Sequence, residues 1–238
     1  MNHKIYIPIS ENACLANTAL ILPVYNSARH LPILIPQLLE IVPPHQIIAV
    51  NDGSQDDSAN ICRNLQVNLL NFDHNQGKGA ALLAGMKHAQ KLGFLFAFTL
   101  DSDEQHNPRH IPQFLSSQNS IAAGIVLGKR KFDSSLMPWQ RICSNKLTSF
   151  LVSIAIRKKI SDSQCGYRLY YLEPIMQLNL KTKRYQFETE ILLKMADLSY
   201  RIAETDVDTV YGNETSHINH LRDITNFVKI LGAHWFKN

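Results

Sequence analysis

The sequence predicts a single α/β domain built on a mixed, mostly parallel sheet with helices on both faces. Short apolar runs of strand length alternate with segments of helical pattern, which is the order that produces a parallel sheet. The strand runs are apolar at nearly every position, as in strands that are covered on both sides. At 238 residues the chain is long enough to bury a substantial core.

The first half of the chain defines its elements through apolar runs and their flanking residues. Strands are expected at 19–22, 47–50 and 67–72. A helix is expected over 31–39, because Pro32 suits a first helical turn. Asp57 or Ser58 is expected to cap the next helix, and a third helix should follow the glycine-containing segment 77–79.

The chain is expected to divide into a preface at 1–17 and a domain at 18–212. In the second half of this domain the alternation of strands and helices continues. Strands are expected at 94–100, 121–128 and 202–211, and helices over about 139–156 and from Phe187. Glu188 is expected to cap the last of these helices, with contact to a site as the alternative. Residues 213–238 should form a loop and an amphipathic helix, whose stripe packs on the domain or contacts a membrane surface. That stripe comprises Ile224, Phe227, Val228, Leu231 and Trp235.

Composition narrows the class of protein. Lys and Arg exceed Asp and Glu by 24 to 20, and no block of like charge is longer than Arg157–Lys159, so nucleic-acid binding is not expected. The four cysteines have neither metal-ligand nor redox spacing, which favours a reduced, cytoplasmic setting. No signal-peptide core begins the sequence. The longest apolar stretch, 147–156, would span only ~15 Å as a helix against a ~30 Å hydrocarbon layer.

The most informative stretch is the acidic turn after the aromatic strand expected at 94–100. Asp101 and Asp103 stand two residues apart where a ligand is expected to bind, at the carboxyl end of a strand. Their oxygens suit Mg²⁺ or Mn²⁺, which usually keep part of their coordination shell for substrate phosphates. An ordinary polar turn is the competing interpretation. An EF-hand is excluded, because counting from Asp101 its glycine position holds His106 and its last acidic position holds Pro112.

Two further strand ends carry polar motifs. The segment 51–54 has the residue types of any turn, although Asp52 could also accept a hydrogen bond from a nucleobase or ribose. The segment 77–79 is not a Rossmann fingerprint, because the last glycine position holds Leu82, and it lacks the Walker pattern. It can still form a tight loop that opens a helix, with backbone N–H groups and Lys78 facing an anion; a flexible turn with a solvated lysine is the alternative.

Together these motifs resemble those of family 2 glycosyltransferases with the GT-A fold, and among them the dolichyl- or polyprenyl-phosphate sugar synthases. The four motifs are Pro23-Val24-Tyr25-Asn26, Asn51-Asp52-Gly53-Ser54, Asn75-Gln76-Gly77-Lys78-Gly79 and Asp101-Ser102-Asp103-Glu104-Gln105-His106-Asn107-Pro108. The resemblance covers about residues 18–212 and keeps the order and spacing of the motifs. It implies a Rossmann-like sheet and a nucleoside-diphosphate sugar, UDP- or GDP-linked, as the donor.

The resemblance also implies roles for individual residues. Nucleotide contacts are expected from Pro23, Tyr25, Asn26, Asp52, Lys78, Asp101 and Ser102. A further contact, with the diphosphate, is expected from Arg130, because it belongs to a basic run at the end of the strand expected at 121–128. Mg²⁺ or Mn²⁺ is expected on Asp101, Asp103 and Gln105. Catalytic roles are expected for Asp103, Asp162 and Arg168. Asn51 stands where many members have aspartate, which leaves the choice of nucleotide open.

The segment 161–168 resembles the acceptor-loop motif of the family. Asp162 is expected to orient or deprotonate the acceptor. Arg168 is expected to hold a phosphate, because its planar guanidinium can bind two oxygens at once. A surface loop with a structural Asp–Arg pair is the alternative. Processive members carry Gln-x-x-Arg-Trp, whereas Gln164 is followed here by Cys-Gly-Tyr-Arg-Leu, so transfer of a single sugar is expected.

The sequence therefore predicts an inverting, metal-dependent, non-processive glycosyltransferase. The expected acceptor is a polyprenyl phosphate reached from the cytoplasm with peripheral membrane contact, and a soluble or glycan hydroxyl is the alternative acceptor. A nucleotidyltransferase would need a glycine-rich signature with Arg and Lys near the first strand, which 23–26 lacks. A non-catalytic nucleotide-sugar-binding protein is a third possibility, disfavoured by the intact acidic and arginine positions.

Overall fold

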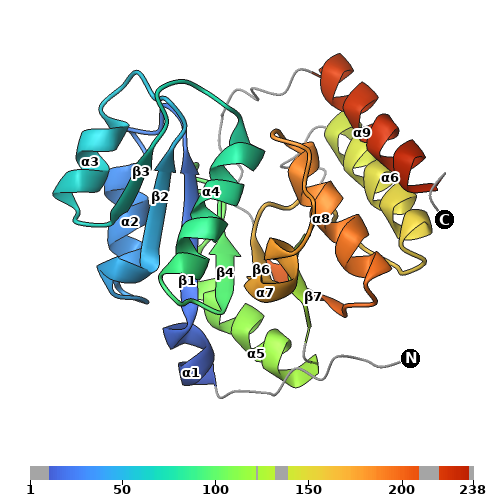
Figure 1. Cartoon of the computed structure of the whole chain (residues 1–238), viewed down its shortest axis with the longest axis horizontal. Helices are drawn as coiled ribbons and strands as arrows, with labels where there is room; N and C mark the ends of the chain where they lie inside the picture. Colours follow the sequence, from blue (N-terminus) through green and yellow to red (C-terminus); the bar gives the residue numbers. More distant parts are fainter. Residues whose placement is uncertain (1–10, 122, 132–138, 209–219, 236–238) are drawn as a thin grey trace.

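The computed structural model describes residues 11–121, 123–131, 139–208 and 220–235. These residues form a seven-stranded sheet in the order β3-β2-β1-β4-β6-β5-β7 (Figure 1). β6 runs antiparallel to both of its neighbours, and the other strand pairs are parallel. The predicted fold class, a mixed and mostly parallel sheet, is confirmed. The strands are β1 Thr18–Val24, β2 Ile47–Asn51, β3 Asn68–Asn71, β4 Phe96–Thr99, β5 Ile125–Arg130, β6 Arg168–Tyr171 and β7 Ile202–Val207.

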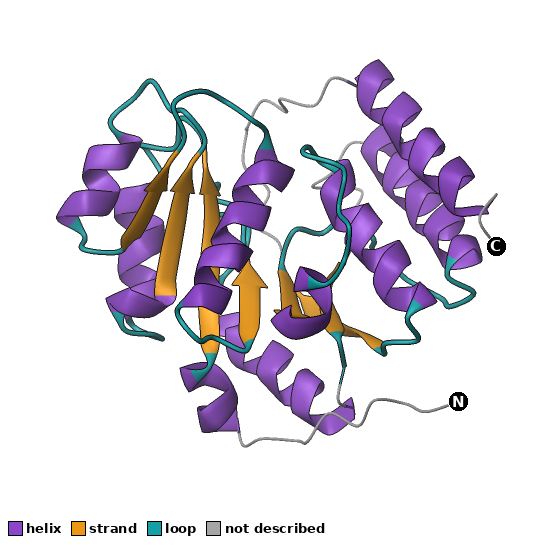
Figure 2. Cartoon of the chain, viewed as in Figure 1, coloured by secondary structure: helices purple, strands orange, loops and turns teal. Residues whose placement is uncertain are grey.

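Helices cover both faces of this sheet (Figure 2). The α-helices are α1 Glu11–Ala16, α2 Leu31–Leu39, α3 Ser58–Asn64, α4 Lys78–Lys91, α5 Ile111–Ile121, α6 Trp139–Ala155, α7 Leu172–Met176, α8 Gln186–Asp197 and α9 His220–Trp235. Alternate residues of β1 point to opposite faces, so Leu20 and Leu22 join a core with α2 and α5, while Ile21 joins a core with α4 and α8. Both layers are needed to bury the apolar strands.

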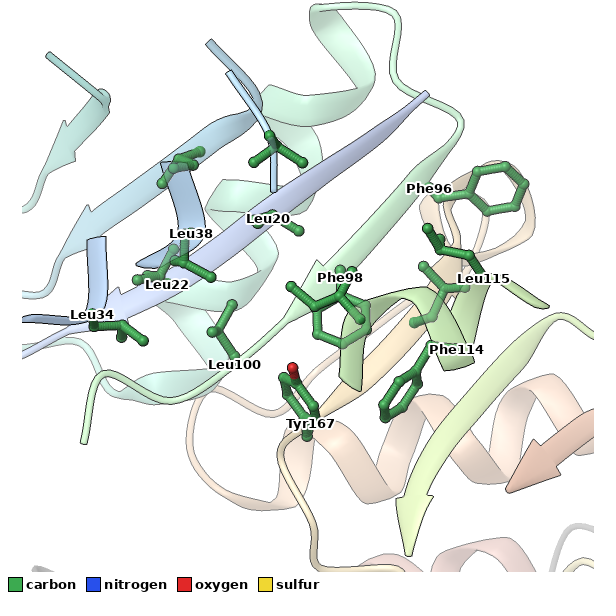
Figure 3. Packing of buried hydrophobic residues seen from close by; sticks show 14 of the residues in the cluster. Leu20, Leu22, Leu34, Leu38, Phe96, Phe98, Leu100, Phe114, Leu115 and Tyr167 are labelled. Carbon is green, nitrogen blue, oxygen red and sulfur yellow. The ribbon is translucent and has the colours of Figure 1, made fainter. Parts of the chain in front are cut away.

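One core cluster ties the acidic turn to the acceptor motif. The ring of Phe98 on β4 meets the rings of Phe114 and Tyr167 edge-to-face, with centroids 4.9 Å and 4.8 Å away (Figure 3). His106 stacks on Tyr167 with 4.8 Å between ring centroids. These aromatic contacts are each worth about 1 kcal/mol beyond burial, and they fix the two loops beside each other.

Several elements differ from those expected from the sequence. The strand expected at 121–128 begins only at Ile125, because Ile121 ends α5, a helix that was not predicted. β6 was also missed, since its four residues follow a loop motif directly. Asp57 occupies the N-cap of α3, as one of the two expected residues, but its side chain makes no capping bond; Asp56 instead accepts from the backbone N–H of Ser58.

At the two ends of the predicted domain, the expected elements agree with the structure only in part. The preface 1–17 contains α1, and its first ten residues lie outside the described ones. The strand expected at 202–211 is seen over Ile202–Val207, and 209–211 lie outside the described residues. The division of the chain at 18 and 212 stays a prediction. None of the described helices combines the length and the apolar character that spanning a membrane requires.

Candidate active site

Three loops that carry predicted nucleotide contacts meet at the carboxyl ends of β1, β2 and β4. The backbone N–H of Asn26 donates to Ser54 Oγ at 2.9 Å, which joins the first loop to the second. Ser27 and Ser102 share a hydrogen bond between their hydroxyls at 2.8 Å, which joins the first loop to the acidic turn. The Tyr25 ring remains 43 % exposed. Loops at adjacent parallel strand ends thus form one surface with an aromatic ring available for stacking.

The glycine loop before α4 is closed by a carboxylate. Asp52 accepts from the backbone N–H of Gln76 at 2.7 Å and from that of Gly77 at 2.9 Å. Gly77 has φ +100°, and a Cβ there would lie 2.7 Å from the carbonyl oxygen of Lys183, so the loop requires glycine. The predicted tight loop that opens a helix is confirmed. In this structure the anion that its amides bind is Asp52, whose contact with a nucleotide stays a prediction.

Lys78, the first residue of α4, points at the acidic turn. Its Nζ lies 2.7 Å from Asp101 Oδ1 and 3.3 Å from Glu188 Oε2. Burial works against the charged form of Lys78, but the two carboxylates outweigh it and raise the pKa above its ordinary value. Burial likewise opposes ionisation of Asp101, yet Lys78 holds the pKa of that carboxyl below its usual range. Both groups are therefore charged at neutral pH.

Glu188 belongs to the site, and its expected role as a helix cap is wrong. α8 begins at Gln186 and has no side-chain capping bond, whereas Glu188 reaches both Lys78 and, at 3.6 Å, Arg168 Nε. Glu188 Oε1 is buried without a hydrogen-bond partner among the described residues. The sequence signal for this role was a carboxylate next to Phe187 on the buried side of a helix, because such a carboxylate needs a cation.

Arg168 organises the acceptor motif from the inside. It is 1 % exposed, and its guanidinium donates to the carbonyl oxygens of Cys165 at 2.6 Å and Ser163 at 2.8 Å. It therefore holds the loop that leads into β6. Its predicted contact with a phosphate stays a prediction.

Asp162 and Arg130 form a buried, two-pronged ion pair. Arg130 Nε and Nη2 donate to the two carboxylate oxygens of Asp162 at 2.6 Å and 3.0 Å, and the carboxylate is fully buried. A structural Asp–Arg pair was the alternative expected for this loop. Asp162 does form such a pair, but with Arg130 of β5 and not with Arg168. Fully paired carboxylates of this kind fix geometry, and a role for Asp162 as a base stays a prediction.

The predicted metal ligands share one turn after β4. Asp103 Oδ1 accepts from the backbone N–H of Gln105 at 3.1 Å, and both side chains are partly exposed. No group of three or more His, Cys, Asp or Glu side chains in the described chain is placed to hold a metal. Magnesium bound with substrate phosphates usually needs only one or two carboxylates, so two aspartates and an amide fit such an ion.

His106 lies behind this turn and is neutral at pH 7. Burial lowers its pKa from 6.5 to about 4. Its Nε2 lies 3.8 Å from Cys165 Sγ, and Nδ1 is buried without a hydrogen-bond partner among the described residues. The ring therefore supports the acidic turn from the protein side and adds no charge to it.

The fold is similar to that of solved GT-A glycosyltransferases. Glucosyl-3-phosphoglycerate synthase from Mycobacterium tuberculosis, solved with Mn²⁺, UDP and glucosyl-3-phosphoglycerate, superposes with a TM-score of 0.71 at 15 % identity. The match covers 99 % of this chain and 86 % of that one. The same synthase without a named ligand superposes with a TM-score of 0.74, covering 95 % of this chain and 85 % of that one. The likeness supports the fold.

The sequence gives the family. The profile "Glycosyl transferase family 2" matches residues 19–178, more than half of the chain, and the chain belongs to this family. Among its relatives, undecaprenyl-phosphate mannosyltransferase of Micrococcus luteus is 25 % identical, over 80 % of this chain and 82 % of that protein. UDP-N-acetylglucosamine--dolichyl-phosphate N-acetylglucosaminyltransferase of Methanococcus voltae is 26 % identical, over 81 % of this chain and 85 % of that protein. The predicted resemblance to the polyprenyl-phosphate branch is confirmed.

Proposed function

We propose that this protein transfers one sugar from a nucleoside-diphosphate sugar to a polyprenyl phosphate, with inversion at the anomeric carbon. The observation that carries the proposal is the contact of Lys78 with Asp101, because it joins the glycine loop to the acidic turn directly beside the acceptor motif. The names of the relatives support a lipid-phosphate acceptor. The sequence Gln164-Cys-Gly-Tyr-Arg-Leu supports transfer of a single sugar.

The donor would lie across the strand ends. Pro23, Tyr25, Asn26, Asp52 and Ser102 would face the nucleoside of a UDP- or GDP-sugar, with the exposed ring of Tyr25 stacking on the base. Lys78 would face the diphosphate, because its ammonium contacts Asp101 at the start of the acidic turn. Arg130 would add a second positive charge from β5, held in orientation by Asp162.

Asp101, Asp103 and Gln105 would hold Mg²⁺ or Mn²⁺. When bound, such an ion neutralises charge on the departing diphosphate. Lys78 contributes to the same end without metal, because a buried ammonium stabilises negative charge more strongly than a solvated one.

A phosphate acceptor explains why the site has little need of a general base. A phosphate monoester has a second pKa of about 6, so its oxygen is already ionised at neutral pH. That oxygen forms the new bond to the anomeric carbon from the face opposite the diphosphate, as the bond to the diphosphate oxygen breaks. Asp162 then acts by positioning Arg130, and Arg168 acts by shaping the loop that receives the acceptor.

We further propose that the protein works at the cytoplasmic face of a membrane without spanning it. The four described cysteines are free thiols, which suits a reducing compartment. A polyprenyl acceptor resides in the bilayer, and none of the described helices could span it, so peripheral contact is the proposed route to the acceptor.

The test is metal-linked nucleotide binding. Asp103→Asn should weaken UDP or GDP affinity at least tenfold in Mn²⁺ and much less in chelator, as measured by titration calorimetry. Asp206→Asn is the control, because Asp206 is an exposed carboxylate that pairs with Lys129 away from the turn. Equal affinities of Asp103→Asn and the parent in Mn²⁺ would remove the metal assignment.

A further inference from the structure

The outward face of α6 exposes large apolar side chains that nothing in the described chain covers. They recur at the spacing of one helical stripe and are Trp139, Leu147, Phe150 and Ile154. Trp139 is 67 % exposed and Phe150 is 61 % exposed. Single exposed apolar residues are ordinary, but four on one side of a helix gather apolar surface of the kind that marks an interaction site.

α9 lies beside α6 at the edge of the molecule (Figure 1). Its Leu231 is buried, so the expectation that the C-terminal stripe packs on the domain is confirmed there. His234 lies 3.3 Å from the carbonyl oxygen of Ala155, which holds the end of α9 against the end of α6. Val228 and Trp235 remain exposed. We call the outward side chains of α6 and α9, together with the basic segment 157–159, the α6–α9 face.

Charged side chains along α6 and the segment that follows it are all positive. Residues 139–160 contain five Lys and Arg and no Asp or Glu; the cations are Arg141, Lys146, Arg157, Lys158 and Lys159. Four of these cations line a cavity of about 530 Å³ together with Phe150 and Ile154. The ammonium of Lys158 donates to the carbonyl oxygen of Ile202, whereas Arg157 and Lys159 are exposed at the end of the helix. Apolar side chains bordered by cations are typical of segments that lie in the interface of a bilayer.

We propose that the α6–α9 face docks on an anionic lipid surface. The apolar stripe would enter the headgroup region while the cations meet lipid phosphates. A second copy of this chain fits less well, because a twofold contact would bring two surfaces of the same positive charge together. An acidic protein partner would satisfy the cations but would leave the exposed tryptophans without a specific role.

α6 contacts the acceptor motif directly. The role of docking, which is to bring this motif to a lipid phosphate, rests on the proposed function. Ser149 on α6 accepts from the backbone N–H of Ser163 at 2.9 Å. Ser153, one turn further along, accepts from the backbone N–H of Ile160 at 2.9 Å. Ser149 is buried on the inward side of α6, so a bilayer bound at the outward side would lie a helix diameter, ~10 Å, from the loop that carries Asp162. A lipid phosphate would have to cross that distance to reach the acceptor motif.

The chain offers a direct optical test, because its two tryptophans both lie on this face. Full-length protein is mixed at low salt with vesicles of phosphatidylcholine containing 30 % phosphatidylglycerol, and with vesicles of pure phosphatidylcholine. The expected result is a blue shift of tryptophan emission and co-flotation with the anionic vesicles only, both lost at high salt. No blue shift and no flotation with anionic vesicles would overturn the proposal.

Matched variants locate the contact. Phe150→Ser with Ile154→Ser should lower the vesicle partition coefficient at least tenfold, as loss of two buried apolar side chains implies. Ile33→Ser is the control, because Ile33 is 49 % exposed on α2 against 50 % for Ile154. Arg157→Gln and Lys159→Gln should each cost about fivefold, whereas Lys91→Gln on α4 should cost little. Equal binding by the α6 variants and the controls would contradict the assignment.

Two further readouts separate the possible failures. Sedimentation without lipid reports the oligomeric state, and a dimer that Phe150→Ser with Ile154→Ser dissociates would assign the face to a second copy and overturn the proposal. The vesicles contain no polyprenyl phosphate, so lipid binding is measured independently of sugar transfer. Binding without transfer would contradict the proposed function alone, and transfer to a water-soluble phosphate acceptor without binding would contradict only the docking.

Discussion

Lys78 Nζ lies 2.7 Å from Asp101 Oδ1, and Gly166 of the acceptor motif closes over this pair. A Cβ at Gly166 would stand 2.7 Å from Asp101 Oδ2 and 2.9 Å from Lys78 Nζ, closer than such atoms approach without displacement. Three separate motifs therefore meet at one contact. A side chain at position 166 would displace the Asp101 carboxylate and the Lys78 ammonium from the positions in which they form the ion pair.

Gly166→Ala should lower turnover by roughly ten- to a hundredfold, because misplaced charge at a reacting centre costs about that much. The fold should persist, since the change adds one methyl group. Gly232→Ala on α9 is the control: a Cβ there meets nothing within 4 Å. Steady-state transfer assays and circular dichroism of both variants decide, and unchanged turnover of Gly166→Ala would show that the ion pair does not matter.

Glu188→Gln removes one of the two carboxylates that hold Lys78. We expect the free energy of unfolding to fall by about 1–3 kcal/mol, because buried cations lose a charged partner. In chelator, the affinity for a diphosphate should rise severalfold. Lys78 then loses one carboxylate partner within the protein, so its ammonium is more available to the ligand. Titration of UDP and GDP, with the exposed Glu40→Gln as control, measures this. A weaker affinity would mean that Glu188 orients Lys78 toward the ligand.

Arg130→Met should cost about 3–5 kcal/mol of unfolding free energy, because it leaves the fully buried carboxylate of Asp162 without its cation. Arg130→Met combined with Asp162→Leu should recover much of that loss. Lys129→Met next to it breaks only an exposed pair with Asp206 and should change little. Urea unfolding of the three variants gives the comparison. Arg130→Met at parental stability would argue that Arg130 serves the ligand alone.

Glu190 should make stability depend on acid. Burial opposes its ionisation, but hydrogen bonds from Lys194 and Thr182 outweigh burial and lower the pKa of the carboxyl. A folded pKa below the ordinary 4.5 means that the stabilisation is present above pH 4.5 and is lost as pH falls through the folded pKa. Glu190→Gln should therefore be less stable at pH 7 and show a flatter acid limb in urea titrations. Parallel acid limbs would contradict this assignment, and Glu40→Gln should behave like the parent.

Much of the fold could be predicted because its strands are buried on both faces. Apolar runs such as 47–50 fit few structures other than a buried strand, and the glycine loop at 77–79 indicated where α4 begins. α5 and β6 were not predicted, for a physical reason. α5 ends at Ile121, within the apolar run 121–128 that was expected to be a strand, and β6 is only four residues long. Their assignment depends on tertiary pairing, which a local pattern does not contain.

The candidate site was predictable by position but not by contact. The sequence predicted site roles for Asp101, Asp162 and Arg168, and the structure places all three in or beside the candidate site. The sequence did not reveal that Asp162 pairs with Arg130, which lies 32 residues earlier, or that Glu188 reaches Lys78 across two helices. Such ion pairs depend on how β5 pairs within the sheet and how α8 packs on it. The local patterns of a single sequence do not show that arrangement.

The most direct measurement is transfer of a radiolabelled sugar from UDP- and GDP-sugars to undecaprenyl phosphate in Mn²⁺, followed by organic extraction. We predict label in the lipid fraction that is lost in Asp103→Asn and retained in Asp206→Asn, with one sugar per lipid. Label that appears only in soluble glycosides or free sugar, with no transfer to lipid phosphate under any donor, would contradict the proposed function.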